Sequence, residues 1–327
     1  MTPDFDHLPS VAGMPQGCAW GVFDQNDQKD RLGTLNWLTP AVVQQAATEV
    51  RQDSWPMGSI AIPNFFRKTL SHRVLELKDP QSVCYGFDDE VALNTQSGSQ
   101  WDSLCHFLHQ PTGLAYNGLR PTVENLEDPE QAVHLPTIDH WHERGCMAGR
   151  GVLIDFKRYA DIHGITYSVF SDFRISPDDI EAVARDQGLQ FRPGDILLLR
   201  FGFTEALASM TGDEQAASLA SHRVCGVEGS KAMARWLWNH QFVAVASDTL
   251  AVEAMPPMEN GQEEQPWKLV LHQWCLSLMG MPLGELWDLH QLSQACHEAQ
   301  RYSFFLTSSP LNVPGGVGSP PNAMAIL

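Results

Sequence analysis

Apolar runs separated by polar breaks occupy the second half of this 327-residue chain, and they predict strands that alternate with helices. Runs with the length and composition of buried strands lie at residues 151–156, 196–203, 242–247 and 303–307. Between them, residues 229–240 carry Met233, Trp236 and Leu237 at helical spacing. Strands that alternate with helices indicate an α/β protein.

Helix-capping residues mark two further helices. Thr39 and Pro40 have the chemistry of an N-cap and a first helical position, which predicts a helix over residues 41–50. Ser176 and Asp179 form a capping box, so a second helix is expected to continue to residue 186 or 187 and to end at Gly188. We also expect a short helix or turn at 141–145 and a helix at 267–279, and we interpret residues 59–108 as strands and turns.

We find no internal repeat and no linker long enough to divide the chain. The sequence therefore predicts a single domain over residues 1–327. Residues 1–50 would form an irregular N-terminal segment followed by a helix, and the Pro/Gly-rich tail at 310–327 would pack on the body.

The composition narrows the possible partners. A net charge of −18 disfavours nucleic acid and anionic membranes, and no apolar run is long enough for a membrane span. The seven cysteines lack a CxxC spacing, and the N-terminus lacks a basic segment followed by an apolar run. We therefore expect a cytoplasmic protein with reduced thiols and a small-molecule substrate.

The segment at residues 96–106 carries the strongest chemical signal. If it is extended, Gln96, Gly98, Gln100 and Asp102 share one face, and His106 follows four residues later. Gly98 leaves open space between two amides and one carboxylate. This arrangement suits a hard metal ion or a polarised small molecule.

The same segment resembles the signature of the cyclase-type metal-dependent hydrolases, which include kynurenine formamidase, isatin hydrolase and trans-dienelactone hydrolase. Their pattern is His-x-Gly-Thr-His-x-Asp-x-Pro-x-His. Gly98, Asp102 and His106 match it, whereas Gln96 and Gln100 stand in place of the first two histidines. The chain is most similar to the long, fungal-like branch, and further similar segments lie at 32–36, 149–155, 193–200 and 310–316.

The resemblance implies a fold, a site and an activity. The fold is a swivelling β/β/α single domain that assembles as a homodimer or homotetramer. His272 and Glu285 fall on a late ligand pair, so Asp102, His272 and Glu285 would hold a divalent metal ion, with Gln100 and Gln96 as further ligands. Amide oxygens in place of imidazoles favour Mn²⁺ over Zn²⁺.

With that site, the expected activity is hydrolysis of a small cyclic or acyl amide or of a lactone. Metal-activated water would attack, and His106 would act as general base and acid. Two other functions remain open. One is a non-catalytic small-molecule binder with a degenerate metal site, and the other is a cyclase or dehydratase that uses the same metal.

Plainer interpretations of the same residues also remain. The two glutamines could form hydrogen bonds within a sheet, and His106 could be a satisfied polar core residue. His272 could cap a helix, and Glu285 could face solvent. Arg150, Arg200 and Asp248 lie in or beside apolar strands, which favours internal ion pairs. Arg200 could instead bind a substrate carboxylate.

Overall fold

The computed structural model describes residues 2–50, 54–56, 58–59, 67–68, 70–77 and 85–327. Part of the predicted segment 59–108 therefore lies outside the described residues, namely 60–66, 69 and 78–84, which include Cys84. Met1 also lies outside them. The six other cysteines are free thiols. Within the described ranges, no helix is long and apolar enough to cross a membrane.

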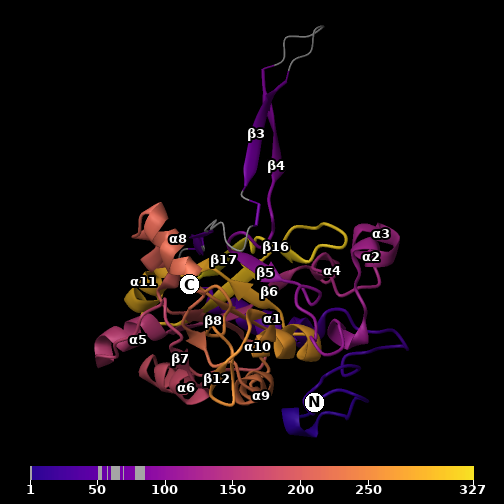
Figure 1. Ribbon diagram of the computed structural model, residues 1–327, viewed down its shortest axis with the longest axis horizontal. Helices are drawn as coiled ribbons and strands as arrows, with labels where there is room; N and C mark the ends of the chain where they lie inside the picture. Colours follow the sequence, from indigo (N-terminus) through magenta and orange to yellow (C-terminus); the bar gives the residue numbers. More distant parts are fainter. Residues whose placement is uncertain (1, 51–53, 57, 60–66, 69, 78–84) are drawn as a thin grey trace.

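One mixed sheet of nine strands organises the molecule (Figure 1). Its spatial order is β1 (Ser54–Pro56), β17 (Ala323–Ile326), β15 (Ser303–Ser308), β6 (Met147–Asp155), β8 (Ile196–Arg200), β10 (Ala244–Ser247), β13 (Leu283–Glu285), β5 (Gln100–Asp102) and β16 (Gly318–Ser319). The central strands β6, β8, β10 and β13 are parallel, and β15 and β5 flank them in the antiparallel direction. The tail contributes β16 and β17 to this sheet.

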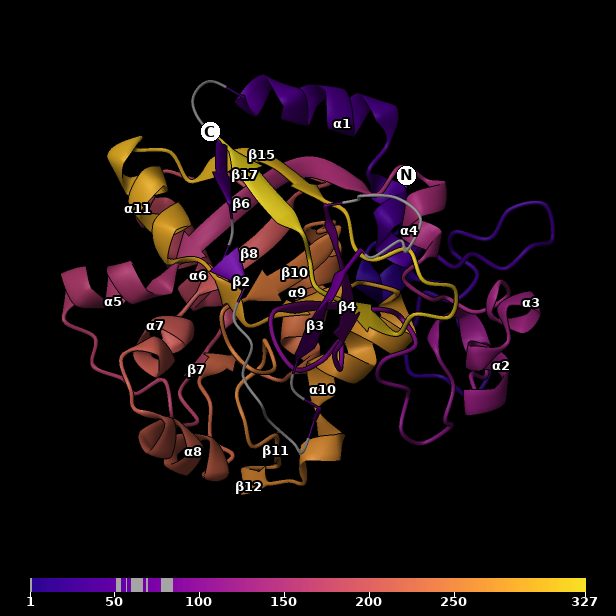
Figure 2. The ribbon, with the colours of Figure 1, turned by 90° about the horizontal axis from the view of Figure 1, so that it is seen from above.

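Helices cover both faces of the central strands because these strands are apolar on both faces. On one face, Val152 and Leu197 pack with α5 (Phe156–His163), α6 (Pro177–Asp186) and α9 (Lys231–Asn239). On the other face, Leu153 and Leu198 pack with α1 (Pro40–Ala46) and α11 (His290–Glu298). Figure 2 shows α1 outside β15 and β6, away from α9. The predicted α/β fold class is confirmed.

Further elements surround the sheet. They include the helices α2 (Val123–Glu127), α3 (Pro129–Ala132), α4 (His140–Glu143), α7 (Phe203–Ala208) and α8 (Gly212–Ala220), and the strand pairs β2 (Gly58–Ser59) with β14 (Trp287–Asp288), β7 (Arg174–Ile175) with β9 (Gly226–Val227), and β11 (Met258–Glu259) with β12 (Gln262–Glu263). The 3-10 helices η1 (Phe5–His7), η2 (Gly33–Trp37), η3 (Ala47–Glu49) and η4 (Tyr116–Gly118) lie in the connecting segments. A hairpin of β3 (Ser71–Glu76) and β4 (Phe87–Ala92) projects from the body (Figure 1).

Local signals located several elements well and others imperfectly. The Ser176–Asp179 capping box is present, and Thr39 caps α1 through the Val42 amide. The helix expected over 267–279 is instead three pieces, namely the 3-10 turn η5 (Pro266–Lys268), α10 (Val270–His272) and the π-helix η6 (Gln273–Met279). The strand expected over 196–203 ends at Arg200 because Gly202 has a positive φ and α7 begins directly after it.

The buried arginines form internal ion pairs, as predicted. Arg150 contacts Asp195 at 2.8 Å and Glu49 at 3.1 Å. Arg200 contacts Asp155 at 2.6 Å and also pairs with Glu205. Asp248 differs, because it accepts hydrogen bonds from the backbone amides at residues 201–203. These contacts give Arg200 a structural role away from the site described below.

Gly33 joins the N-terminal segment to the loop that precedes β13. Gly33 has φ +57°, and a Cβ built there would lie 1.9 Å from the carbonyl oxygen of Gly280. That oxygen accepts a 2.8 Å hydrogen bond from the Thr34 amide, and the Thr34 hydroxyl donates to Val243. The contact therefore requires a residue without a side chain.

We predict that Gly33→Ala is strongly destabilising. A left-handed alanine costs roughly 1–2 kcal/mol, and the backbone clash adds about 1–3 kcal/mol. Gly164→Ala is the matched control, because Gly164 has φ +67° and open space around its Cα. Urea unfolding of both variants checks the difference, and equal losses would show that the Gly280 contact is not tight.

Candidate metal site

The site lies where β5 pairs with β13. In this register Gln100 is opposite Glu285 and Asp102 is opposite Leu283, so the side chains of Gln100, Glu285 and Asp102 share one face. On the opposite face, Trp101 packs against Gly284, where a Cβ would lie 3.0 Å from the indole ring. The large side chain of Trp101 fits over Gly284, which has none. This contact favours the β5–β13 register that brings the Asp102 and Glu285 carboxylates together.

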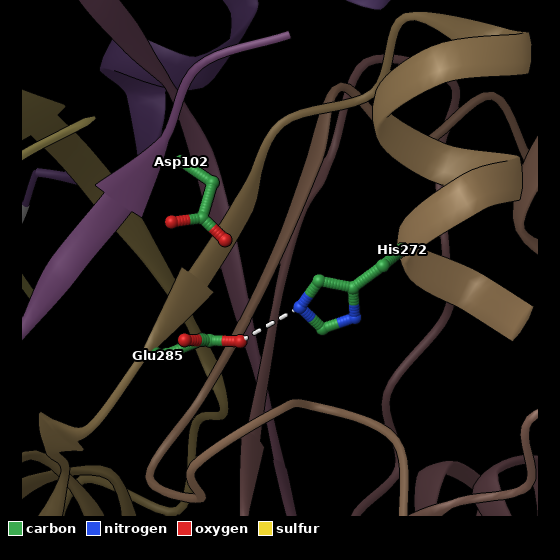
Figure 3. A group of neighbouring side chains, drawn as sticks. All are labelled: Asp102, His272 and Glu285. Carbon is green, nitrogen blue, oxygen red and sulfur yellow. Dashed lines mark hydrogen bonds and ion pairs between the residues drawn. The ribbon is translucent and has the colours of Figure 1, made fainter. Parts of the chain in front are cut away.

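His272 completes the cluster from the end of α10 (Figure 3). One potential ligand atom from each of Asp102, His272 and Glu285 lies within 4.8 Å of the others, and all three residues are buried. His272 Nε2 is 3.0 Å from Glu285 Oε1. The three residues that the sequence placed far apart therefore meet at one point.

The two glutamines lie beside this cluster and donate to its carboxylates. Gln96 Nε2 donates to Asp102 Oδ1 at 2.6 Å, and Gln100 Nε2 donates to Glu285 Oε2 at 2.5 Å and to Gln96 Oε1. An ionised carboxylate only accepts hydrogen bonds, so the amide nitrogens must face it. Both polar atoms of the Gln96 side chain are therefore engaged. Its role as a metal ligand stays a prediction.

The expected extended face is only partly present. Strand geometry covers Gln100–Asp102, whereas Gln96 lies in a turn in which the Ser97 amide donates to the Asn94 carbonyl at 3.0 Å. Gln96 reaches Asp102 from this turn rather than from a shared strand face. The sequence prediction assumed one continuous strand and was wrong on this point.

Two buried oxygens of the cluster, Gln100 Oε1 and Asp102 Oδ2, have no hydrogen-bond partner among the described residues. Unsatisfied buried acceptors are costly unless a donor or a cation occupies the space beside them. With His272 Nε2 and a Glu285 oxygen, they form a set of oxygen donors and one imidazole nitrogen. This set fits a divalent cation.

A residue that sequence reasoning missed holds His272 in place. Glu253 is fully buried, and its Oε1 accepts from the His272 amide at 2.9 Å and lies 3.1 Å from His272 Nδ1. Its Oε2 accepts from the Val270 amide at 2.9 Å. With Nδ1 bonded to Glu253, Nε2 faces Glu285 and Asp102. A single charge within the apolar run at 251–255 was the available signal.

Burial and charge shift the titration of this cluster. Burial alone would lower the pKa of His272, but hydrogen bonds to Glu253 and Glu285 raise it above its ordinary value. Burial and the nearby Asp102 charge raise the pKa of Glu285. The cluster therefore holds a proton tightly at neutral pH, and the binding of a divalent cation there would release it.

His106 lies beside the cluster rather than in it. It is half-buried and lines a cavity of about 370 Å³ together with His272 and Glu285. The other lining residues are Arg67, Phe107, Leu250, Ala251, Met255, Pro266, Trp267 and Leu269. Burial lowers the pKa of His106, so its imidazole is neutral at neutral pH. A neutral imidazole facing a cavity can accept a proton.

The fold and this cluster define an α/β protein with a buried site suited to a divalent cation. The family model Cyclase, described as "Putative cyclase", matches residues 33–254. The chain belongs to this cyclase family. A comparison with the curated proteins finds no match.

Solved structures agree with this assignment. The crystal structure of a novel cyclase is 25% identical, with a TM-score of 0.78 over 95% of this chain and 99% of that chain. Isatin hydrolase A from Labrenzia aggregata, bound to benzyl benzoate, is 13% identical, with a TM-score of 0.52 over 87% of this chain and 96% of that chain. An isatin hydrolase bound to thioisatinate is 14% identical, with a TM-score of 0.53 over 87% and 95%. The two isatin hydrolases show a shared fold.

We predict that Glu253→Gln lowers the affinity for Mn²⁺ by about 10- to 100-fold, because partners of metal-bound histidines have effects of this size. The amide cannot accept from both His272 and Val270 without turning an N–H group toward a donor. Calorimetric titration of metal-free protein measures the change.

Glu49→Gln is the matched control for this substitution. Glu49 is also a buried acid with several partners, Arg150, Arg301 and Ser303, but it lies outside the cluster. The Glu49→Gln substitution should lower the stability of the fold and leave the affinity for Mn²⁺ unchanged. Equal affinities in both variants would contradict a positioning role for Glu253.

Proposed function

We propose that this protein is a metal-dependent hydrolase of a small amide or lactone. The observation that carries the proposal is the convergence of Asp102, His272 and Glu285 within 4.8 Å, beside two unpartnered oxygens and a cavity that also contains His106. Family membership and the fold shared with isatin hydrolases support the same class of reaction.

The ion would be held by Asp102, His272 and Glu285, with Gln100 Oε1 as a further oxygen ligand. This mostly oxygen donor set favours Mn²⁺ over Zn²⁺. When bound, a divalent ion polarises a carbonyl oxygen and lowers the pKa of water. Glu253 fixes the ring of His272 so that Nε2 faces Glu285, where the ion would be held.

The chain's own residues would then handle the proton and the substrate. His106 accepts a proton from the attacking water and delivers it to the departing nitrogen or oxygen. The apolar walls formed by Phe107, Leu250 and Trp267 exclude bulk water and seat an apolar part of the substrate. Water adds to the carbonyl carbon, the C–N or C–O bond breaks, and a carboxylate forms.

One observation favours a second candidate, a small-molecule binder without a metal. Gln96 and Gln100 already donate hydrogen bonds to Asp102 and Glu285. These amide groups therefore stabilise the two buried carboxylates in part, as a bound cation would. Elemental analysis after Mn²⁺ supplementation separates the two functions, because a binder would retain no stoichiometric metal. Product analysis distinguishes hydrolysis from cyclisation or dehydration at the same site.

Chelation should abolish hydrolysis of a panel of acyl amides and lactones. Dialysis against a chelator removes the ion, and added Mn²⁺ should restore turnover more fully than Zn²⁺. Asp102→Asn serves as the comparison, since it removes a charged ligand and should not recover with Mn²⁺. Turnover that is indifferent to chelation would rule out the metal-dependent reaction.

His106→Ala should lower kcat by about 100- to 10,000-fold, which is the range for general acid–base catalysis, while bound Mn²⁺ is unchanged. The wild-type kcat/KM should stay high down to the ordinary histidine pKa of about 6.5 and fall only at lower pH, because burial lowers the pKa of His106 and only the neutral ring is a base.

His109→Ala is the nearby control for this prediction. His109 forms a 2.9 Å hydrogen bond with Thr112 and does not line the cavity described above. It should keep most of the activity and the same pH profile. Similar losses in the two variants would show that His106 has no special role.

A further inference from the structure

A cavity of about 230 Å³ lies at the end of the central strands opposite to the metal site. Three arginines, Arg150, Arg192 and Arg301, line it, and none of the described residues that line it is acidic. Asp195, which contacts Arg150, directly precedes β8, whereas Glu285 is the last residue of β13. Because β6, β8, β10 and β13 run parallel, these two residues lie at opposite strand ends. The cavity is therefore separate from the proposed catalytic site.

Two of these arginines have hydrogen-bond donors to spare. A guanidinium group has five N–H donors. Arg301 Nη1 donates to the carbonyl oxygen of Glu49 at 2.7 Å and to its Oε2 at 3.2 Å, and Arg192 Nη1 lies 3.5 Å from Glu49 Oε1. The Nε and Nη2 groups of both arginines have no hydrogen-bond partner among the described residues. The Arg192 side chain is 47% exposed, so an ion can reach it from solvent.

Positive charge is in excess around this cavity. Glu49 pairs with all three arginines, and Asp195 pairs with Arg150. Burial alone would raise the pKa of Glu49, but the Ser303 hydroxyl and the three guanidinium groups lower it below its ordinary value. Burial raises the pKa of Asp195 to about 6, so both acids are ionised at pH 7. Three cations against two carboxylates leave one positive charge, on a chain whose net charge is −18.

A fourth arginine adds to this charge. Arg158 lines an adjoining cavity of about 170 Å³ that shares three lining residues with the first, Tyr302 among them. Arg158 Nε is buried and has no hydrogen-bond partner among the described residues. The acids of the adjoining cavity, Asp155 and Asp186, have a guanidinium and an imidazole partner of their own. The charge of Arg158 is therefore not cancelled there.

We propose that this cavity binds a phosphate group, either the free ion or a small monoester, through Arg192, Arg301 and Tyr302. Guanidinium forks match phosphate oxygens in geometry and charge. Arg192 lies in the loop after α6 and Arg301 lies between α11 and β15, so the donors come from separate elements. Converging donors suit a tetrahedral anion better than a planar carboxylate. The volume is below the roughly 300–1,000 Å³ of sites for drug-sized ligands, so the ligand is small.

Calorimetric titration with inorganic phosphate tests the proposal. The full chain is first freed of divalent ions, which excludes phosphate binding to a metal, and wild type should then show one saturable site. Arg192→Gln should raise the Kd by about 10- to 100-fold, because it removes a charge-assisted contact. Arg185→Gln is the matched control. It removes the same charge from neighbouring α6, but Arg185 lines neither cavity, so binding should match wild type.

Tyr302→Phe provides an independent variant, since it keeps the ring and removes only the hydroxyl. It should raise the Kd by about 3- to 10-fold. Phenyl phosphate serves as the monoester probe, and tighter binding than inorganic phosphate would identify a monoester rather than the free ion as the ligand. The absence of saturable binding, or equal weakening by Arg192→Gln and Arg185→Gln, overturns the proposal. Tighter binding of succinate than of phosphate also overturns it, because the cavity would then select carboxylates.

Discussion

The buried carboxylates of the site must have a positive charge beside them, and the arrangement of the surrounding residues depends on this requirement. Asp102, Glu253 and Glu285 surround His272 almost out of reach of solvent. Buried carboxylates without a counter-charge are prohibitive. The raised pKa of His272 shows one solution, in which a proton on the imidazole supplies the charge. A divalent cation would be the other solution, and the oxygens of Gln100 and Asp102 that have no partner among the described residues are suited to it.

The fold brings these groups together by pairing strands that are far apart in the sequence. β5 comes from the first third of the chain and β13 from the last part, and their register alone puts Gln100 opposite Glu285. His272 arrives on a helix that changes to π geometry directly after it. Glu253 then fixes the ring from a third segment. The site depends on long-range contacts rather than on any local motif.

Features that depend on neighbouring residues, such as helix caps and apolar strand runs, were predictable from the sequence. The Ser176–Asp179 capping box lies where its pattern placed it, and the apolar central strands do so apart from their ends. The resemblance to the family singled out Asp102, His272 and Glu285, which lie close together in the structure, and their role as metal ligands stays a prediction. The turn at Gln96 was missed because it depends on short-range hydrogen bonds to Asn94, and the role of Glu253 was missed because it depends on hydrogen bonds to His272, 19 residues away in the sequence. Periodicity carries no information about such contacts.

The separation between β5 and β13 has a consequence for biosynthesis. Translation delivers Asp102 long before His272 and Glu285, and native contacts between distant segments form late. A nascent chain that ends before α10 lacks two of the three converging residues, His272 and Glu285. Metal capture is therefore tied to completion of the polypeptide, and an incomplete ribosomal product offers no assembled ion-binding pocket in the cell.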